Sequence, residues 1–216
     1  MKPGGRARRP EDKEARKAEI ADAARAALDT GRPYGDLTMD EVLAPTGLSK
    51  GTAYLYFPSK EALFLHVLME DLAGWFEVLV PAAQALPLGK DPAALAPVLA
   101  DTLLAQPRLI RLLGLLHAVL EPGVDLDTAL RFKRFLAEQL GAVDAALAPF
   151  LPGFQPGDVA RLLLVAHALV VGLEGMASPA PAVAQALEQP DLRWLKVDFR
   201  ETFTGALAAT LRGWRP

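Results

Sequence analysis

The sequence predicts an all-α protein of about nine helices. Apolar residues recur at helical spacing through most of the chain, and proline or glycine stands at nearly every boundary between these segments. No segment shows the apolar–polar alternation between turn signals that indicates a half-buried strand. The predicted helices fall into a short N-terminal head and a longer C-terminal body.

The first predicted helix spans residues 10–30. Its apolar side chains lie on one stripe of the helix and would cover the next two elements: Ile20, Ala23, Ala24, Ala27 and Leu28. Gly31 and Pro33 follow and end the helix.

A very short second helix follows. Thr38 and Glu41 have the spacing of a capping box, in which each side chain satisfies a backbone N–H of the other residue. Pro45 disfavours a helical conformation at Ala44, so the sequence predicts that this helix ends early.

The third predicted helix spans residues 49–57. Residues 45–47, Pro-Thr-Gly, form the turn before it, and Ser49 can act as its N-cap. Two short helices joined by a Gly-containing turn indicate a helix-turn-helix over residues 38–57. The second helix of such a unit enters the DNA major groove.

The body contains the remaining predicted helices. The first of them is ended by Pro87 and Gly89, and the fourth is ended by Pro149, Pro152 and Gly153. Ser59 caps the first one. The predicted spans are residues 59–85, 91–106, 108–121, 125–149, 158–176, 183–188 and 195–212.

Composition limits the class of protein. Of the 216 residues, 51% are hydrophobic and 23% charged, which describes a soluble globular chain with a substantial core. The absence of cysteine excludes disulfides and thiol chemistry and fits a cytoplasmic location. The N-terminus lacks the apolar region of a signal peptide. The longest apolar stretch, about residues 162–173, is too short to span a bilayer, so no membrane association is predicted.

Charge is distributed unevenly along the chain. The net charge is −3, yet residues 1–60 hold 11 Lys or Arg against 9 Asp or Glu, and residues 61–216 hold 12 against 17. Four basic residues precede Pro10 with no acidic residue among them. This asymmetry favours a small DNA-reading head on an acidic body, and residues 1–12 are interpreted as a basic flexible arm. A solvated tail without a partner is an equally good interpretation of residues 1–9.

Residues 13–69 resemble the DNA-binding domain of the tetracycline-repressor (TetR) family of bacterial transcription regulators. The resemblance rests on Thr38-Met39, residues 47–52 (Gly-Leu-Ser-Lys-Gly-Thr), Tyr54, Tyr56-Phe57 and residues 59–63 (Ser-Lys-Glu-x-Leu). The chain departs from the family pattern at three places: Asp29 follows Leu28 where an aromatic is common, Pro33 replaces a usual glycine, and Leu43-Ala44-Pro45 replaces an Ala-rich helix end.

The resemblance implies a homodimeric regulator, most often a repressor, that binds a palindromic operator in double-stranded DNA. Phe57 and Ala53 would form the buried face of the recognition helix. Lysines and hydroxyls would bind phosphates, Gly51 would allow close approach to the groove, and Leu55 could contact a thymine methyl group. The predicted DNA-binding residues are Thr38, Ser49, Lys50, Gly51, Thr52, Tyr54, Leu55, Tyr56 and Lys60. The alternative is a capped surface helix whose aromatics only pack.

Residues 70–216 would bind a small ligand and dimerise. Apolar walls with few polar groups are typical of small-molecule sites, and the resemblance implies an apolar or amphipathic inducer. The predicted pocket residues are Trp75, Phe76, Leu113, Leu116, His117, Phe132, Phe135, Leu136 and His167. Each of them could instead belong to an ordinary core.

The last two long helices carry apolar residues on more than one face, so they need a second partner. The family pairs these helices across a two-fold axis into a four-helix bundle. The predicted interface residues are Ala168, Gly172, Gly175, Phe199, Phe203, Ala206, Thr210 and Trp214. The alternative is that both helices are buried within a monomer.

No cofactor or metal is predicted. His66, His117 and His167 lack the spacing of metal ligands on one helix, and His117 with Glu121 supplies two candidate ligands at most. A helical enzyme is the first rival interpretation, but the sequence shows no nucleophile–base pair. A ligand-binding protein with a degenerate head and a transcriptional activator of the same family are the others.

Overall fold

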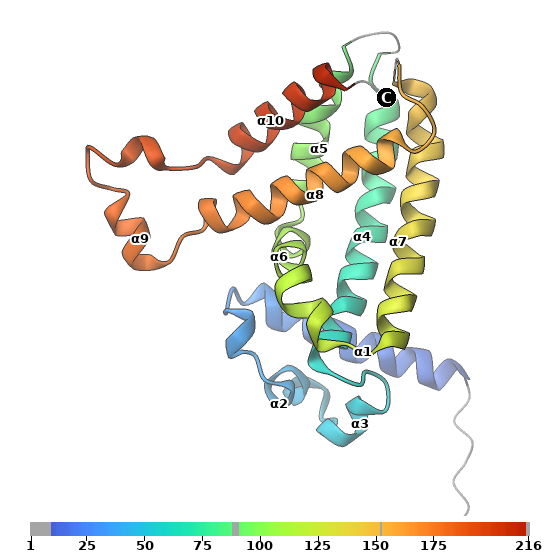
Figure 1. Cartoon of the computed structure of the whole chain (residues 1–216). Coiled ribbons are helices and arrows are strands. Elements are labelled where there is room, and N and C mark those ends of the chain that lie inside the picture. Colours follow the sequence, from blue (N-terminus) through green and yellow to red (C-terminus); the bar gives the residue numbers. More distant parts are fainter. Residues whose placement is uncertain (1–9, 88–90, 152, 215–216) are drawn as a thin grey trace, which may run out of the picture.

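A computed structural model describes residues 10–87, 91–151 and 153–214 of the chain. Over these ranges the fold is all-α, as predicted, and contains ten α-helices and no strand (Figure 1). The α-helices are α1 (Pro10–Asp29), α2 (Met39–Leu43), α3 (Lys50–Tyr54), α4 (Lys60–Gln84), α5 (Leu95–Leu104), α6 (Pro107–Leu115), α7 (Leu126–Leu147), α8 (Asp158–Ala177), α9 (Pro181–Ala186) and α10 (Phe199–Gly213). Residues 1–9, Gly89 and Pro152, about which the sequence made predictions, lie outside the described residues.

The head consists of α1, α2, α3 and the first turns of α4. Figure 1 shows these helices at one end of the molecule, with α4 running from the head into the body. The head core contains Ile20, Leu43, Ala53 and Phe64, each of them buried. Tyr34 packs its ring edge against Phe64 at a centroid distance of 5.1 Å. Because α4 belongs to both parts, the head and the body share one continuous helix.

The body is built around α4. This helix packs along α7 and also contacts α5 and α6, while α8 packs on α6, α7 and α10 (Figure 1). The far ends of α8 and α10 extend away from α4 and α7, and α9 lies in the connection between them. Among the described residues, no helix of the same chain covers the outer side of the far parts of α8 and α10.

The second helix ends where the sequence predicts, but not for the predicted reason. Helix α2 ends at Leu43, yet Ala44 keeps helical dihedrals (φ −48°, ψ −42°) and opens a 3₁₀ helix, Ala44–Thr46. Proline is tolerated in the first turn of a helix because its missing N–H would have no partner there. The prediction that Pro45 removes Ala44 from the helical region was wrong.

Several further helices differ from their predicted spans: α3 covers Lys50–Tyr54 instead of residues 49–57, α5 covers Leu95–Leu104 instead of 91–106, and α9 covers Pro181–Ala186 instead of 183–188. Helix α10 begins at Phe199 instead of 195, because the Asp198 carboxylate accepts a 2.8 Å hydrogen bond from the backbone N–H of Glu201 and caps it. The predicted helix over residues 108–121 is α6 followed by a π-helical turn, Leu116–Leu120, and a 3₁₀ turn, Glu121–Gly123. Side-chain periodicity did not distinguish the π turn from an α turn.

Helix α8 extends the apolar stretch of residues 162–173 to a longer apolar helix. Its 20 residues are long and apolar enough, by length and composition, to cross a bilayer. That corrects the prediction that no segment reaches this length. The core helix of a soluble domain meets the same criterion, and only 28% of the most apolar window of α8 is buried in its own chain. Much of its apolar surface is therefore free for another partner.

Candidate functional site

The capping box predicted at the start of α2 is present. The backbone N–H of Glu41 donates to Thr38 Oγ1 at 3.3 Å, and the backbone N–H of Thr38 donates to Glu41 Oε2 at 2.9 Å. The Thr38 hydroxyl and the Arg32 guanidinium also donate to this carboxylate. The backbone bond from Thr38, followed by these two side-chain bonds, lowers the pKa of Glu41 to about 2. The box thus fixes where α2 begins.

The turn between α2 and α3 is held by short polar side chains. Gly47 has φ +65°, a left-handed conformation that glycine adopts without steric cost. The Thr46 hydroxyl donates to the Leu43 carbonyl at 2.8 Å and accepts from the Leu48 N–H at 3.1 Å. Ser49 Oγ accepts from the Thr52 N–H at 3.2 Å and caps α3 as predicted. These bonds set the direction in which α3 leaves the turn.

Helix α3 and the turn that follows it, residues 55–57, bury one face and expose the other. Ala53 and Phe57 lie in the head core. Tyr54 is 41% exposed and Leu55 75% exposed, a large apolar side chain left in solvent. Ser49, Lys50 and Gly51 are exposed beside them. The Lys50 ammonium lies 3.8 Å from the Asp40 carboxylate and 6.0 Å from the centre of the Tyr54 ring.

The other predicted DNA-binding residues are partly buried or form hydrogen bonds within the head. Thr52 and Tyr56 are half-buried, and the exposed Thr38 uses its hydroxyl in the capping box. Lys60 Nζ donates to the carbonyls of Tyr34 at 3.2 Å and Leu37 at 2.8 Å. It also lies 4.1 Å from the centre of the Tyr34 ring. The sequence predicted a phosphate contact for Lys60, but its ammonium group is occupied in holding the segment between α1 and α2.

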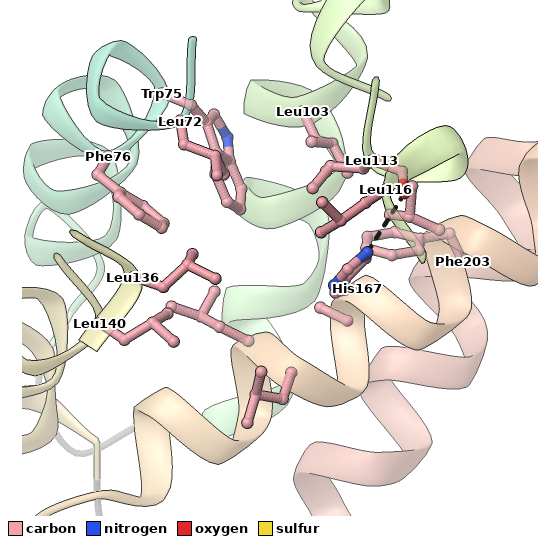
Figure 2. A pocket seen from close by; sticks show the side chains of 14 residues that line it. Leu72, Trp75, Phe76, Leu103, Leu113, Leu116, Leu136, Leu140, His167 and Phe203 are labelled. Atoms are coloured by element: carbon pink, nitrogen blue, oxygen red, sulfur yellow. Dashed lines mark hydrogen bonds between the residues drawn. The ribbon is translucent and has the colours of Figure 1, made fainter. Parts of the chain in front are cut away.

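A cavity of about 60 Å³ lies in the body and is lined by side chains of α4, α5, α6, the π turn after α6, α7, α8 and α10 (Figure 2). Six of the nine predicted pocket residues line it: Trp75, Phe76, Leu113, Leu116, Leu136 and His167. Eight more residues line the cavity that were not predicted there: Leu72, Leu103, Leu140, Leu163, Leu164, Ala166, Val170 and Phe203. Helical spacing could have found several of these, because Leu140 lies four residues after Leu136 and Val170 lies three after His167.

Three predicted pocket residues do not line this cavity. Phe132 is 1% exposed and belongs to the core, and Phe135 is half-buried against that core. His117 is turned outward, where its Nδ1 lies 2.9 Å from the Glu121 carboxylate. Its ring stacks on that of His167 at a centroid distance of 5.1 Å. The expectation that all three face the pocket was therefore wrong.

The cavity wall carries no formal charge. His167 is the only titratable lining residue, and its Nε2 lies 3.4 Å from the Leu113 carbonyl. Burial is the main cause that lowers the pKa of His167, so the ring is neutral near pH 7. Trp75 Nε1 donates to Thr102 Oγ1 at 3.1 Å and is thereby satisfied. Such a wall can bind an uncharged apolar molecule but offers no counter-ion for a charged one.

A continuous apolar stripe is exposed along α8. It contains the three small residues predicted at an interface, Ala168, Gly172 and Gly175, together with Leu164, Val165, Val171 and Met176. On α10, Ala206, Thr210 and Phe199 are half-buried. Phe203 is 0% exposed and Trp214 stacks on Phe154 at 5.7 Å, so both pack within the chain instead of on a free surface.

Two groups of contacts join the head to α6 and the turns that follow it. The Arg108 guanidinium binds the carboxylates of Asp71 at 2.7 Å and Asp29 at 2.8 Å, linking α6 to α4 and α1. Arg111 donates to the carbonyls of Leu28, at 2.9 Å, and Arg32. At the other end of this segment, the Ser59 hydroxyl donates to the Gly123 carbonyl at 2.9 Å. The helix that supplies Leu113 to the cavity is thus tied directly to the head.

Matches to two known family models together cover nearly the whole chain. A family model described as "Bacterial regulatory proteins, tetR family" matches residues 20–67. A second, described as "Tetracyclin repressor-like, C-terminal domain", matches residues 69–216. Among individual curated proteins there is no match. The boundary between the two family matches falls within α4, the helix that the head and the body share.

Proposed function

This chain belongs to the TetR family of DNA-binding transcriptional regulators, and from that premise we propose that it is a ligand-responsive repressor. It would bind a palindromic operator as a homodimer in the cytoplasm and release it when a small molecule enters the body. The observation that carries the proposal is the exposed face of α3, which is capped at Ser49 and presents Tyr54 and Leu55 to solvent.

On DNA, the exposed residues of α3 would divide into two roles. Ser49, Lys50 and Tyr54 would bind phosphates and set the position of the helix, while Leu55 would contact a thymine methyl group and help specify sequence. Gly51 would let the backbone approach the groove. Thr38, Thr52, Tyr56 and Lys60 would act mainly by shaping the head, since each is half-buried or engaged within it.

The inducer would be an uncharged, mainly apolar molecule bound between α4, α6, α7 and α8. The 60 Å³ cavity is smaller than the roughly 150 Å³ cavity that holds benzene in another protein, so a ligand must displace its walls. The ligand would then bind the conformation with displaced walls more tightly than the conformation without them. A difference of this kind is required for any ligand to shift their populations.

Dimerisation would use the apolar stripe of α8 together with the neighbouring exposed side of α10. The half-buried Ala206 and Thr210 would lie at the edge of that interface, and Phe203 and Trp214 would support it from within the chain. Specific interfaces bury about 1,200–2,000 Å² in total.

The experiment that tests the DNA-binding role is titration of the chain's own upstream DNA at several salt concentrations. Lys50→Ala should weaken binding to all sequences about equally and lower the salt slope by roughly 0.9 per lost phosphate contact in each subunit. Lys133→Ala removes an exposed lysine from the body and should change neither quantity.

Two results would count against the proposal. If the unmutated chain does not bind its upstream DNA or other bacterial promoter fragments, the head is degenerate and the chain is a ligand-binding protein. If Lys50→Ala leaves affinity and salt slope unchanged, the assignment of α3 to the groove is wrong. A reporter gene behind the bound promoter separates repression from activation.

A further inference from the structure

A second cavity, of about 180 Å³, lies at the junction of the head and the body. It shares no lining residue with the cavity described above. Its wall comes from α1, the turn between α3 and α4, one face of α4, and the start of α7. The lining residues are Lys17, Tyr56, Phe57, Pro58, Ala62, Leu65, His66, Met69, Thr128 and Arg131.

One side of this cavity is cationic. Arg131 donates to the hydroxyl of Thr128 at 3.1 Å. Because Thr128 is buried, this hydrogen bond anchors the guanidinium to the surface of α7. Within the part of the chain that the structure describes, Arg131 forms no ion pair, but a carboxylate is near: the pKa of Asp125 is lowered by its hydrogen bonds from Thr128 and, to a smaller extent, by the charge of Arg131. Lys17 contributes to the cavity wall from α1 and pairs with Glu14, whose side chain is 69% exposed. Most of the hydrogen-bonding capacity of the guanidinium thus remains available.

His66 lines the same cavity. Its Nε2 is 3.7 Å from the Glu70 carboxylate, and its ring centre lies 5.2 Å from that of Phe57. The pKa of His66 is lowered, first by burial and then by Lys17, Arg25 and Arg131, although Glu70 opposes the shift. The positive charges of two separate helices therefore act together on the interior of this cavity.

The floor of the cavity is apolar. Phe57 and Leu65 are 5% and 1% exposed, and Met69 is half-buried beside them. A phosphate or carboxylate is bound most strongly by charge-assisted hydrogen bonds from arginine and lysine, while an adjacent apolar floor favours a hydrocarbon tail. A bare inorganic anion would leave that floor unused.

We propose that this junction cavity is a second effector site, which binds a small amphipathic anion. The carboxylate or phosphate head would lie between Lys17 and Arg131, and a short apolar tail would lie on Phe57, Leu65 and Met69. A molecule bound there would tie α1 and the α3–α4 turn to α7, which fixes the head against the body. The body cavity, whose wall has no charge, takes a different chemical class, so the chain would respond to two kinds of molecule.

The test is isothermal titration of the full chain, without DNA, with four compounds that each contain six carbon atoms: hexanoate, hexyl phosphate, 1-hexanol and hexylammonium. At least one anion should bind saturably, one per chain, and the alcohol and the ammonium compound should bind at least about tenfold more weakly. The ranking of hexanoate and hexyl phosphate identifies the preferred head group.

Arg131→Gln should weaken anion binding about tenfold. Arg134→Gln is the matched control, because it makes the same change at an exposed position three residues further along α7 that does not line the cavity.

Several outcomes would overturn the proposal. They are the absence of anion binding, equal binding of hexanol, and equal losses in Arg131→Gln and Arg134→Gln. If Leu136→Trp in the body cavity abolishes anion binding while Arg131→Gln does not, the anion occupies the body cavity. If no small anion binds but Arg131→Gln lowers the salt slope on DNA, the cations serve DNA phosphates. Since the titration uses no DNA, its result is independent of whether the chain is a repressor.

Discussion

Capping residues show what the sequence could predict at the scale of single residues. Thr38, Ser49 and Ser59 were each predicted to begin a helix, and each accepts a backbone hydrogen bond from the residue three positions later. These bonds depend only on neighbouring residues, so a local pattern reveals them. The partners of Lys60 lie 23 and 26 residues away, at Leu37 and Tyr34, and no local pattern contains that information.

The Glu41 carboxylate should make the stability of the head depend on pH. Its pKa is lowered from 4.5 to about 2, because it accepts hydrogen bonds from the Thr38 backbone, the Thr38 hydroxyl and Arg32. A lowered pKa means that the stabilisation is complete above the unfolded value of 4.5 and is lost as pH falls toward 2. Glu41→Gln lacks this charge, so its stability deficit relative to the unmutated chain should shrink over that range.

Chemical denaturation at pH 7, 4 and 2.5 measures that deficit. Asp40→Asn, which removes the neighbouring negative charge in the first turn of α2, controls for a general effect of charge. Parallel pH profiles for the unmutated chain and Glu41→Gln would show that the box does not stabilise the ionised form.

At the scale of elements, the sequence predicted α4 well and the segment after α6 poorly. The apolar pattern of α4 runs from the N-cap Ser59 to the stop signal at Pro87, and the predicted span of residues 59–85 matches the helix Lys60–Gln84 within a residue at each end. The π turn Leu116–Leu120 was missed, because one extra residue in a helical turn leaves the apolar pattern nearly unchanged. That turn positions Leu116 in the cavity and leads to Gly123, which contacts the start of α4.

Gly123→Ala should separate this segment from α4. A Cβ at Gly123 would lie 2.3 Å from Glu61 Cγ and 2.9 Å from Glu61 Cβ, so the turn must move, which would stretch the bond from Ser59. Overpacking of this kind costs about 1–3 kcal/mol of unfolding free energy. The control is Gly141→Ala in α7, where an added Cβ meets no atom within 4 Å. That variant should be stabilised by about 0.5–1 kcal/mol, since alanine favours a helix. Urea denaturation measures both, and equal stability of the two variants would contradict the contact.

At the scale of the whole molecule, the sequence predicted two parts and the surplus apolar surface of the last long helices, but not which side of each faces inward. The stripe chosen on α10 included Phe203, whereas the structure buries Phe203, Leu207 and Leu211 in the body. A helical stripe shows that residues share a face, and it cannot identify the partner that covers them. On α8 the predicted residues Ala168, Gly172 and Gly175 do lie on the exposed side, but the larger apolar residues of that stripe, such as Leu164 and Val171, were not predicted.

Ala168→Asp should convert the proposed dimer to monomers without unfolding the chain. Ala168 is exposed at the centre of the α8 stripe, so a buried charge would arise only in the dimer, where it has no partner. Phe203→Asp would not test this, because Phe203 is fully buried in the monomer. Ala137→Asp makes the same change on an exposed position of α7 and should stay dimeric. Light scattering at micromolar concentration reports the mass, and an unmutated chain that is already monomeric would refute the dimer.

Coupling between the body cavity and the operator is the last property expected of the whole molecule. Leu136 lines the cavity and is half-buried, so Leu136→Trp should fill the cavity at limited cost to folding and block an uncharged inducer. Phe135→Trp is the control, because Phe135 is the residue next to Leu136 in sequence and its side chain does not line the cavity. Both variants should bind operator like the unmutated chain, but only Leu136→Trp should lose ligand binding.

Titration of uncharged apolar compounds into the protein–operator complex measures this coupling. A true inducer must weaken operator binding, and the operator must weaken inducer binding by the same factor. The corresponding coupling free energy is typically about 1–3 kcal/mol. A compound that binds the cavity yet changes operator affinity by less than about twofold has nearly equal affinity for both conformations, and such a compound shifts nothing. If every tight binder of the cavity behaves in this way, the cavity is part of the core and the switch lies elsewhere in the chain.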